Sequence, residues 1–209
     1  MDKKNTAGTT PRQRASTRRR QKIFAALRKC IIDKGYSTTT LADIAREAEM
    51  SPSHLLYYFS DKSDILSQYF DNVSTRIKER LQEFRAEPAP RRIELFARLF
   101  FSGKALPKTE IGFMLECFGV AVHDSELQQQ KTELDRFCKE YLSALFEELG
   151  EPEEAAAYSA EVSYALLVGL RTAVYFDRGL SVDKAHQIFR DEMLKLAESS
   201  DAKTIKRAI

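Results

Sequence analysis

The stretch "TTTLADIAREAEMSPSHLLYYFSDKSDIL", residues 38–66, decides the fold, because it contains the signals for two short helices joined by a tight turn. Thr40 is a good N-cap for a helix that starts at the next residue. Ser51 is a good N-cap for a second helix, with Pro52 at the first position, where a missing N–H group costs nothing. We therefore predict helices over about Leu41–Ala48 and Pro52–Phe59.

The second of these helices has two different faces. Leu55 and Phe59 lie four residues apart and share a face that packs against the rest of the domain. The opposite face carries Ser53, His54, Tyr57 and Tyr58. A tyrosine combines a flat apolar ring with a hydroxyl group, which suits phosphates, sugar edges and thymine methyl groups. We therefore predict a helix-turn-helix whose second helix recognises DNA.

The charge distribution agrees with a polyanionic partner at one end of the chain. Residues 1–62 contain 13 Lys and Arg residues but only 6 Asp and Glu residues, whereas the whole chain of 209 residues has a formal net charge of +2. The remainder is therefore acidic. Such a polarity is typical of a protein whose basic end meets nucleic acid, although a solvated, charged helix surface gives the same pattern.

Helical spacing of apolar residues recurs throughout the chain, and strand-like alternation is nearly absent. We therefore predict an all-α fold. The nine predicted helices run over about Thr17–Lys34, Leu41–Ala48, Pro52–Phe59, Lys62–Phe84, Arg92–Ser102, Thr109–His123, Ser125–Leu149, Glu153–Asp177 and Val182–Ser199. A basic arm, residues 1–16, and a tail, residues 200–209, are predicted to be mobile.

The sequence lacks the signals of several classes of protein. No apolar run approaches the roughly 20 residues that a membrane helix needs, and the basic N-terminus lacks the apolar segment of a secretory signal. There is no Gly-rich phosphate loop and no nucleophile elbow, so we predict that the protein is not an enzyme.

The cysteines and histidines fit a reduced, metal-free protein. The three cysteines lie in apolar helical patterns, at positions 30, 117 and 138. We therefore predict that Cys30, Cys117 and Cys138 are buried, reduced thiols of a cytoplasmic protein; a redox sensor is the alternative. The three histidines, at positions 54, 123 and 186, stand apart and have no cysteine partners at ligand spacing. We therefore predict no metal site and no cofactor.

Residues 38–66 resemble the DNA-binding segment of the TetR family of bacterial repressors, whose pattern is roughly T-[apolar]-x-x-I-A-x-x-A-G-V-S-x-x-x-L-Y-x-Y-F-x-x-K. The matching residues are Thr40, Ile44, Ala45, Ala48, Ser51, Leu55, Tyr58, Phe59 and Lys62. The first helix, with "IFAAL" before "GY", also matches, so the resemblance covers about residues 17–66. It implies a helix-turn-helix domain over 17–62 and a larger helical domain for ligand binding and dimerisation over 63–199.

The resemblance also implies a function and a set of DNA contacts. The function would be that of a homodimeric repressor, released from a near-palindromic operator by a small-molecule effector. The implied DNA-binding residues are Thr40, Ser53, His54, Tyr57, Tyr58 and Lys62, with Arg18, Arg19 and Arg20 of the basic arm. Alternatives remain open: His54 is simply solvated, Lys62 pairs with Asp61 or Asp64, or one of the tyrosines packs on the first helix.

Two departures from the family pattern bear on this function. Glu49 replaces the usual turn glycine, which strains the backbone if the turn requires a positive φ. Leu56 replaces a tyrosine that in relatives commonly holds a phosphate. These departures favour an alternative function, a helical ligand-binding or adaptor dimer that has lost operator binding.

The C-terminal helices are rich in aromatic residues, and the resemblance implies that they enclose an effector pocket. The candidate pocket residues are Phe96, Phe100, Met114, Glu116, Phe118, His123, Phe137, Tyr141, Tyr164, Arg171 and Tyr175. Among these, Glu116, His123 and Arg171 are polar residues embedded in apolar patterns and are the natural recognition points. The alternatives are a plain core for the aromatic residues, and internal ion pairs or exposed positions for the polar ones.

The last two helices have the composition of a dimer interface. Small residues are frequent in "AAAYSAEVSYALLVGLRTAVYF", residues 155–176, and small residues permit the close approach of helices. With the helix over about Val182–Ser199, this segment predicts a four-helix interface between two copies of the chain. The candidate interface residues are Ala157, Ala160, Ala173, Ile188 and Phe189. An intramolecular core is the alternative.

Overall fold

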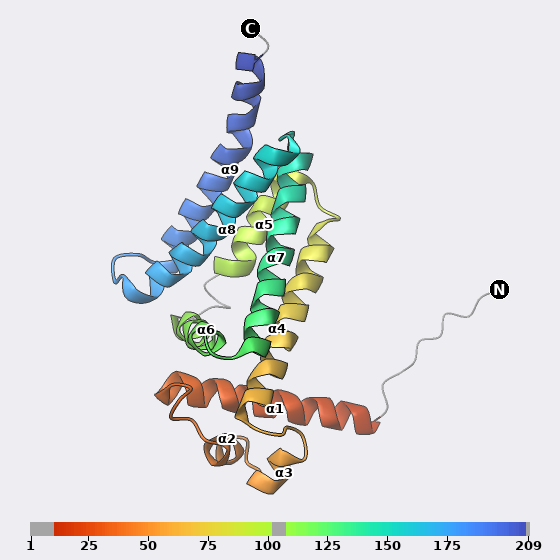
Figure 1. The fold of residues 1–209 in the computed structure, drawn as a ribbon, viewed down its shortest axis with the longest axis vertical. Coiled ribbons are helices and arrows are strands. Elements are labelled where there is room, and N and C mark those ends of the chain that lie inside the picture. The colour runs from red at the N-terminus through yellow and green to blue at the C-terminus, as the bar shows by residue number, and fades with distance from the viewer. Residues whose placement is uncertain (1–10, 102–107, 208–209) are drawn as a thin grey trace, which may run out of the picture. The chain divides into compact units, whose positions relative to one another are not determined.

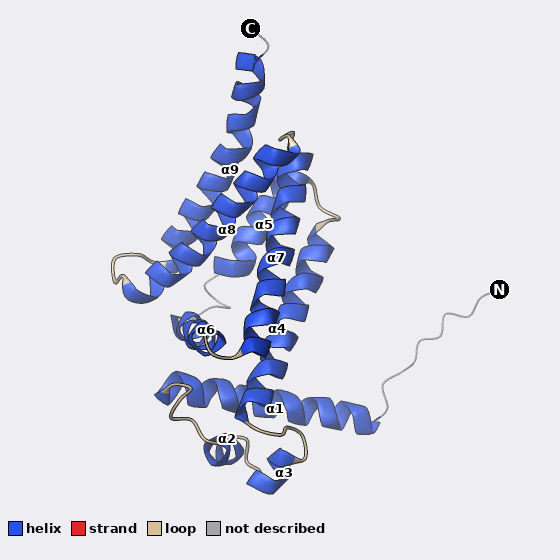
Figure 2. Cartoon of the chain, in the orientation of Figure 1, coloured by secondary structure: helices blue, strands red, loops and turns tan. Residues whose placement is uncertain are grey.

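The computed structural model describes residues 11–101 and 108–207, and these residues form two compact units that divide after Tyr69. Helices are the regular elements of the described residues (Figure 2). The division falls inside α4, Lys62–Phe84, seven residues beyond the domain boundary predicted at Lys62. Within the described part of the chain, no helix combines the length and the apolarity needed to span a bilayer.

The N-terminal unit is a small three-helix domain to which the first residues of α4 also belong. Its own helices are α1 (Pro11–Lys34), α2 (Leu41–Glu47) and α3 (Pro52–Leu56) (Figure 1). Apolar residues at helical spacing on α1 meet those of the two short helices and of α4 in one core. The buried core residues are Ile23, Phe24, Leu27, Ile31, Ile44, Ala45, Leu55, Phe59, Ile65 and Leu66.

The C-terminal unit is a helical bundle completed by the second part of α4. Its helices are α5 (Ala89–Phe101), α6 (Lys108–Ala121), α7 (Ser125–Glu148), α8 (Glu153–Phe176) and α9 (Val182–Arg207). α8 packs between α7 and α9, and α5 packs against α9 (Figure 1). Phe96, Phe101, Tyr141, Phe146 and Phe189 are the largest side chains of the fully buried core.

The predicted helices are present, and four of their ends differ from the prediction by three residues or more. α5 begins at Ala89 and not at about Arg92. α1 begins at Pro11, so residues 11–16 of the predicted arm are helical, whereas residues 1–10 lie outside the described residues. α9 continues to Arg207, into the predicted tail. α3 ends at Leu56 and not at Phe59; beyond its end, the N–H groups of Tyr58 and Phe59 both donate to the carbonyl of Leu55 in a turn.

Candidate nucleic-acid interface

A capping box fixes the start of α2. The hydroxyl of Thr40 accepts a hydrogen bond from the N–H of Asp43 at 3.2 Å, and the N–H of Thr40 donates to the Asp43 carboxylate at 3.0 Å. The ammonium group of Lys34 donates to the same carboxylate, and together with the bonds from Thr40 it lowers the pKa of Asp43 well below the ordinary value of 3.8. Thr40 is exposed, but its hydroxyl proton is directed to Asp43 at 2.6 Å, so a phosphate contact there requires the hydroxyl to rotate.

The turn between α2 and α3 passes through a left-handed residue. Glu49 has a φ of 52°, so the turn does require the positive φ that glycine adopts most easily. The N–H of Met50 donates to the carbonyl of Ala45 at 2.9 Å and closes the turn. The carboxylate of Glu49 accepts a hydrogen bond from Lys22 of α1, which lowers the pKa of Glu49. A side chain that replaces glycine thus ties the turn to α1.

α3 presents its polar residues to solvent and one leucine to the core. The hydroxyl of Ser51 accepts a hydrogen bond from the N–H of His54 at 3.2 Å, which caps the helix. Leu55 is fully buried, whereas Ser53 and His54 are exposed. Leu56 is 50% exposed.

Three aromatic rings gather at the end of α3, and we call them the aromatic cluster: His54, Tyr57 and Tyr58. The ring centroids of His54 and Tyr58 are 5.5 Å apart, and those of Tyr57 and Tyr58 are 5.2 Å apart in an edge-to-face arrangement. Tyr57 is 75% exposed, and Tyr58 is half-buried. Because α3 ends at Leu56, the two tyrosines lie on the turn that follows the helix and not on the helix itself.

The arginines of α1 divide into an exposed group and a structural group. The guanidinium of Arg19 donates a hydrogen bond to the hydroxyl of Tyr58 at 3.1 Å, which links α1 to the aromatic cluster. Arg20 is half-buried: it donates to the side chain of Gln68 and lies over the ring of Phe59, 5.0 Å from its centroid. Arg18 is exposed. The DNA contacts predicted for all three stay predictions, but Arg20 already has partners within its own domain.

Lys62 makes hydrogen bonds to the segment before α2, which the sequence did not predict. Its ammonium group donates hydrogen bonds to the carbonyls of Tyr36 at 2.7 Å and Thr39 at 2.8 Å, and it lies 4.1 Å from the centroid of the Tyr36 ring. Burial lowers the pKa of Lys62. Both predicted alternatives, a phosphate contact or a pair with a neighbouring aspartate, left out this contact with the segment before α2. Lys62 thereby positions the start of α2.

These contacts connect the parts of an exposed surface with hydrogen-bonding and aromatic groups. The surface consists of Thr40 at the start of α2, Ser53 and the aromatic cluster around α3, and the exposed arginines of α1. It offers hydroxyl groups, an imidazole, aromatic faces and guanidinium groups, which together suit phosphate oxygens and base edges. Among the described residues, no group of three or more His, Cys, Asp and Glu side chains is arranged to hold a metal ion.

The predicted pocket residues of the C-terminal unit have different surroundings. Phe96 and Tyr141 are stacked in the middle of the core, with ring centroids 6.0 Å apart. Phe100 is also buried, while Phe118 and Phe137 are half-buried beneath lysine side chains. Tyr175 lies directly against Gly112 of α6: a Cβ atom there would be 2.6 Å from its ring, so α6 and α8 approach closely at this glycine. The aromatic residues therefore form a packed core in the structure.

Two of the three polar recognition points lie at exposed positions, the alternative that the sequence left open for them. Glu116 and His123 are exposed, and neither faces the interior. Glu116 is exposed although it follows the buried Phe113 by less than one helical turn, and His123 follows the end of α6 at Ala121. Arg171, by contrast, is buried, and it donates a hydrogen bond to the Sδ atom of Met114. Nearby, the hydroxyl of Tyr164 donates to Asp135 of α7.

Two of the predicted interface residues have the alternative position, in the intramolecular core. Ala160 and Phe189 are almost completely buried within their own chain, although Ala160 also lines an open hollow between α7 and α8. α8 is apolar on more than one face, so spacing alone did not distinguish the face that packs inside from the face that remains open. Ala157 is exposed, and Ala173 and Ile188 are half-buried, so the interface prediction for these three stays a prediction.

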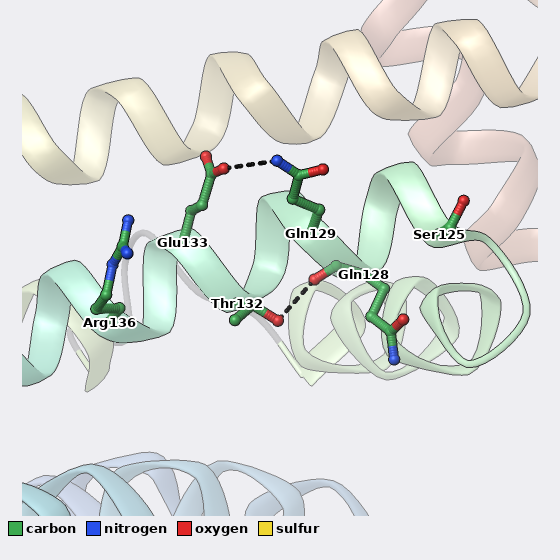
Figure 3. Close-up of a pocket in the computed structure, with 6 residues that line it drawn as sticks. All are labelled: Ser125, Gln128, Gln129, Thr132, Glu133 and Arg136. Carbon is green, nitrogen blue, oxygen red and sulfur yellow. Dashed lines mark hydrogen bonds between the residues drawn. The ribbon is translucent and has the colours of Figure 1, made fainter.

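Two hollows on α7 are open and polar. One, of about 360 Å³, is lined by Ser125, Gln128, Gln129, Thr132, Glu133 and Arg136, all exposed (Figure 3). Its polar groups bond to one another along the helix: Gln129 donates to Glu133, and Thr132 donates to the carbonyl of Gln128 (Figure 3). The second, of about 470 Å³, lies between α7 and α8 and includes Lys139 and Glu161. None of the predicted pocket residues lines either hollow.

Comparison with known proteins decides the family. Residues 23–69 match the family described as bacterial regulatory proteins, tetR family, and residues 89–197, more than half of the chain, match the family described as BetI-type transcriptional repressor, C-terminal. The chain belongs to the TetR family. It is therefore a transcriptional regulator with an N-terminal helix-turn-helix domain and a C-terminal helical domain, as the sequence predicted.

The relatives of this TetR-family regulator agree with that assignment. The HTH-type transcriptional regulator HbdR of Aromatoleum sp. (strain CIB) is 46% identical over 55 residues, which are 26% of this chain and only 24% of HbdR. A regulator from Pseudomonas aeruginosa PAO1 shares the fold with a TM-score of 0.75 at 18% identity, over 90% of this chain and 94% of that one. A regulator from Saccharomonospora viridis, solved in complex with choline, has a TM-score of 0.73 at 22% identity; the match covers 84% of this chain and 95% of that one.

Three contacts that position the candidate DNA-binding residues of this TetR-family domain were missed by sequence reasoning. They are the bond from Arg19 to Tyr58, the ties of Arg20 to α4, and the bonds from Lys62 to the segment before α2. Each joins residues more than 20 positions apart, so no local pattern announces it. The bonds of Lys62 also have no sequence signature, because their acceptors are backbone carbonyls, which every residue carries.

Proposed function

We propose that this regulator represses transcription as a homodimer bound to a near-palindromic operator, and that a small-molecule effector releases it. The observation that carries the proposal is the aromatic cluster. Tyr57 is largely exposed directly after a capped α3, and Tyr58 is held by Arg19 of α1. Fixed rings with free edges favour a defined partner, and the basic N-terminal third of the chain favours DNA as that partner.

An open apolar stripe on α8 supports the homodimer. Tyr158 is 69% exposed and Phe176 is 71% exposed, and Ala165 and Gly169 lie exposed between them at helical spacing. This stripe lies on a different face from the buried residues of α8 that pack against α7 and α9. A stripe of large and small apolar residues is the surface that two helices of a dimer bury against their copies. Exposed Ala157 lies beside Tyr158 and belongs to the same surface.

Release by an effector is supported by the fold and by relatives. α4 is one uninterrupted helix whose first residues, including Ile65, belong to the core of the DNA-binding unit and whose last residues, including Leu81, belong to the core of the C-terminal unit. The choline complex of the Saccharomonospora viridis regulator favours small-molecule binding in this fold. An effector weakens DNA binding only if it prefers the conformation with lower DNA affinity. We place this activity in the cytoplasm, where a bacterial operator is found and where the three unpaired cysteines remain reduced.

A second function, a ligand-binding dimer that has lost operator binding, is favoured by two observations. The exposed carboxylate of Glu49 lies on the turn that leads into α3, where it repels phosphate unless Lys22 neutralises it. Exposed Leu56 offers no hydrogen bond at a position that the family pattern assigns to a phosphate contact. Measured DNA affinity separates the two functions.

The test is the affinity of the full-length protein for duplex DNA selected from a random pool, measured by fluorescence anisotropy at several salt concentrations. Tyr57→Ala should weaken binding by about 1–3 kcal/mol, in part selectively for the selected sequence. Val122→Ala, at an exposed apolar residue outside both the helix-turn-helix and the α8 stripe, is the control and should leave DNA affinity unchanged. No salt-dependent binding by the folded wild-type protein would favour the second function.

A further inference from the structure

Arg171 is a charged side chain on the buried face of α8. It is only 8% exposed, and it shares its face with the buried residues Leu167 and Val174. Ser163, two turns earlier on that face, is fully buried, and its hydroxyl has no hydrogen-bond partner among the described residues. Of the three polar residues on this buried face, Ser159 donates a hydrogen bond to Glu151, whereas Ser163 and Arg171 lie among apolar neighbours.

The partners of Arg171 do not neutralise its charge. Its guanidinium donates to the thioether sulfur of Met114 on α6 and lies 5.8 Å from the centroid of the Phe100 ring, while its Nε has no hydrogen-bond partner among the described side chains. No carboxylate of the described residues forms an ion pair with Arg171. A thioether is a weak acceptor and an aromatic face a weak anion substitute, so both leave most of the charge uncompensated.

Another buried arginine of the same unit, in contrast to Arg171, is paired with a carboxylate. Arg92 of α5 is 3% exposed, and its guanidinium is paired with the carboxylate of Glu148 on α7. Burial of a cation without an anion costs several kcal/mol, whereas a paired and hydrogen-bonded cation is tolerated. The contrast between these two arginines indicates that the anion for Arg171 comes from outside the described part of the chain.

The state of Arg171 supports this reasoning. Burial lowers its pKa to about 10, against a weaker opposing effect of Tyr164. A group with that pKa is still protonated at neutral pH, so the side chain does not escape the cost of burial by losing its proton. A guanidinium in such surroundings is well suited to bind a carboxylate with two parallel hydrogen bonds.

We propose that the effector of this regulator carries a carboxylate, which pairs with Arg171, on an aromatic or aliphatic body that packs against Phe100 and Met114. This inference rests on the proposed function in one respect, because it takes the C-terminal unit as the effector domain. It places the effector in a charge class opposite to that of choline, the quaternary ammonium compound bound by the Saccharomonospora viridis regulator. The apolar surroundings exclude a bare inorganic anion, which would gain nothing from the ring and the thioether.

The experiment measures binding to the full-length protein without DNA, by thermal shift and by calorimetric titration. The probes are 3-phenylpropionate and octanoate, each compared with its neutral amide, with choline, and with sodium sulfate at equal ionic strength. The acids should raise the melting temperature in a saturable manner, and the other probes should not. In Arg171→Met, affinity for the acids should fall by about 30-fold or more, as for a buried ion pair that loses one partner.

Arg178→Gln is the matched control, since Arg178 is exposed just beyond the end of α8; it should bind the acids as the wild type does. A wild-type protein that responds to neither acid, or equally to the acids and to the amides or sulfate, overturns the proposal. So does undiminished acid binding by Arg171→Met. The acid–amide comparison uses only the wild type, so it decides even if that variant does not fold. Because no step involves DNA, failure here leaves operator binding untouched, and failure of operator binding leaves this result standing.

Discussion

With glycine at position 49, the helix-turn-helix should be more stable than with alanine at the same position. The turn holds this residue at a φ of 52°, a conformation that costs a residue with a Cβ atom about 1–2 kcal/mol and costs glycine little. The side chain also contributes a bond to Lys22, so the variant must be compared with one that lacks the carboxylate but keeps the Cβ atom. Alanine at position 49 provides that comparison.

The difference between the two variants isolates the backbone effect. Glycine loses about 0.4–1 kcal/mol relative to alanine because its unfolded chain is more flexible, which leaves a net advantage of about 0.5–1 kcal/mol for glycine. The advantage should appear as a several-fold slower hydrogen exchange of the amides in the core of the domain, such as those of Ile44 and Leu55. Residue-resolved exchange is the appropriate assay because the chain has no tryptophan and divides into two units.

The result that would refute this reasoning is an equal or faster exchange of those amides in Glu49→Gly than in Glu49→Ala. In that case the turn would not be strained by a side chain, and the departure from the family glycine would have no energetic consequence. If both variants exchanged much faster than the wild type, the bond to Lys22 would be the dominant contribution of Glu49 to the domain.

Three further outcomes follow from individual contacts. Lys62→Met removes two hydrogen bonds to backbone carbonyls but keeps the apolar stem of the side chain. The free energy of local opening of α2, measured by hydrogen exchange, should therefore fall by about 2 kcal/mol. Unchanged exchange would mean that Lys62 does not stabilise the start of α2. Tyr158→Asp should convert dimers to monomers in sedimentation experiments at micromolar concentration, whereas a dimer that persists would move the interface off the α8 stripe. The pKa of Asp43 is lowered in the folded state, so its stabilising contribution is present above its ordinary pKa of 3.8 and is lost as the pH falls from there towards the lowered value. When the pH falls from about 5 to 3, the hydrogen-exchange protection of α2 should therefore decrease less in Asp43→Asn than in the wild type. An identical decrease in both proteins would contradict a stabilising role of the Asp43 carboxylate.

Local signals in the sequence predicted most of the fold. The caps at Thr40 and Ser51, the proline at the first position of α3 and the apolar spacing on α1 each act within a few residues, and the structure contains all of them. The positive φ at Glu49 was likewise foreseeable from the family pattern. Such features depend on neighbouring atoms, so a linear reading is sufficient to find them.

Features that depend on packing between distant elements were not predictable in the same way. Spacing showed that α8 is apolar but not which of its faces packs inside, so Ala160 was assigned to the interface while exposed Tyr158 was overlooked. The outward direction of Glu116 depends on how α6 is rotated against α7 and α8, which single-helix periodicity leaves open. Arg171 was named from its apolar surroundings alone, and only the structure revealed which groups it contacts.

In vitro selection of DNA bound by the full-length protein from a random duplex pool tests operator recognition by a dimer. We expect enrichment of a near-palindrome whose two half-sites lie about one helical turn, roughly 34–36 Å, or a multiple of it apart, because a two-fold symmetric dimer presents two copies of α3 to the major groove. Enrichment should disappear when the selection is repeated with Tyr57→Ala and Tyr58→Ala combined. A folded, dimeric wild-type protein that enriches no sequence above the starting pool would contradict the account and leave the chain as a ligand-binding dimer without an operator.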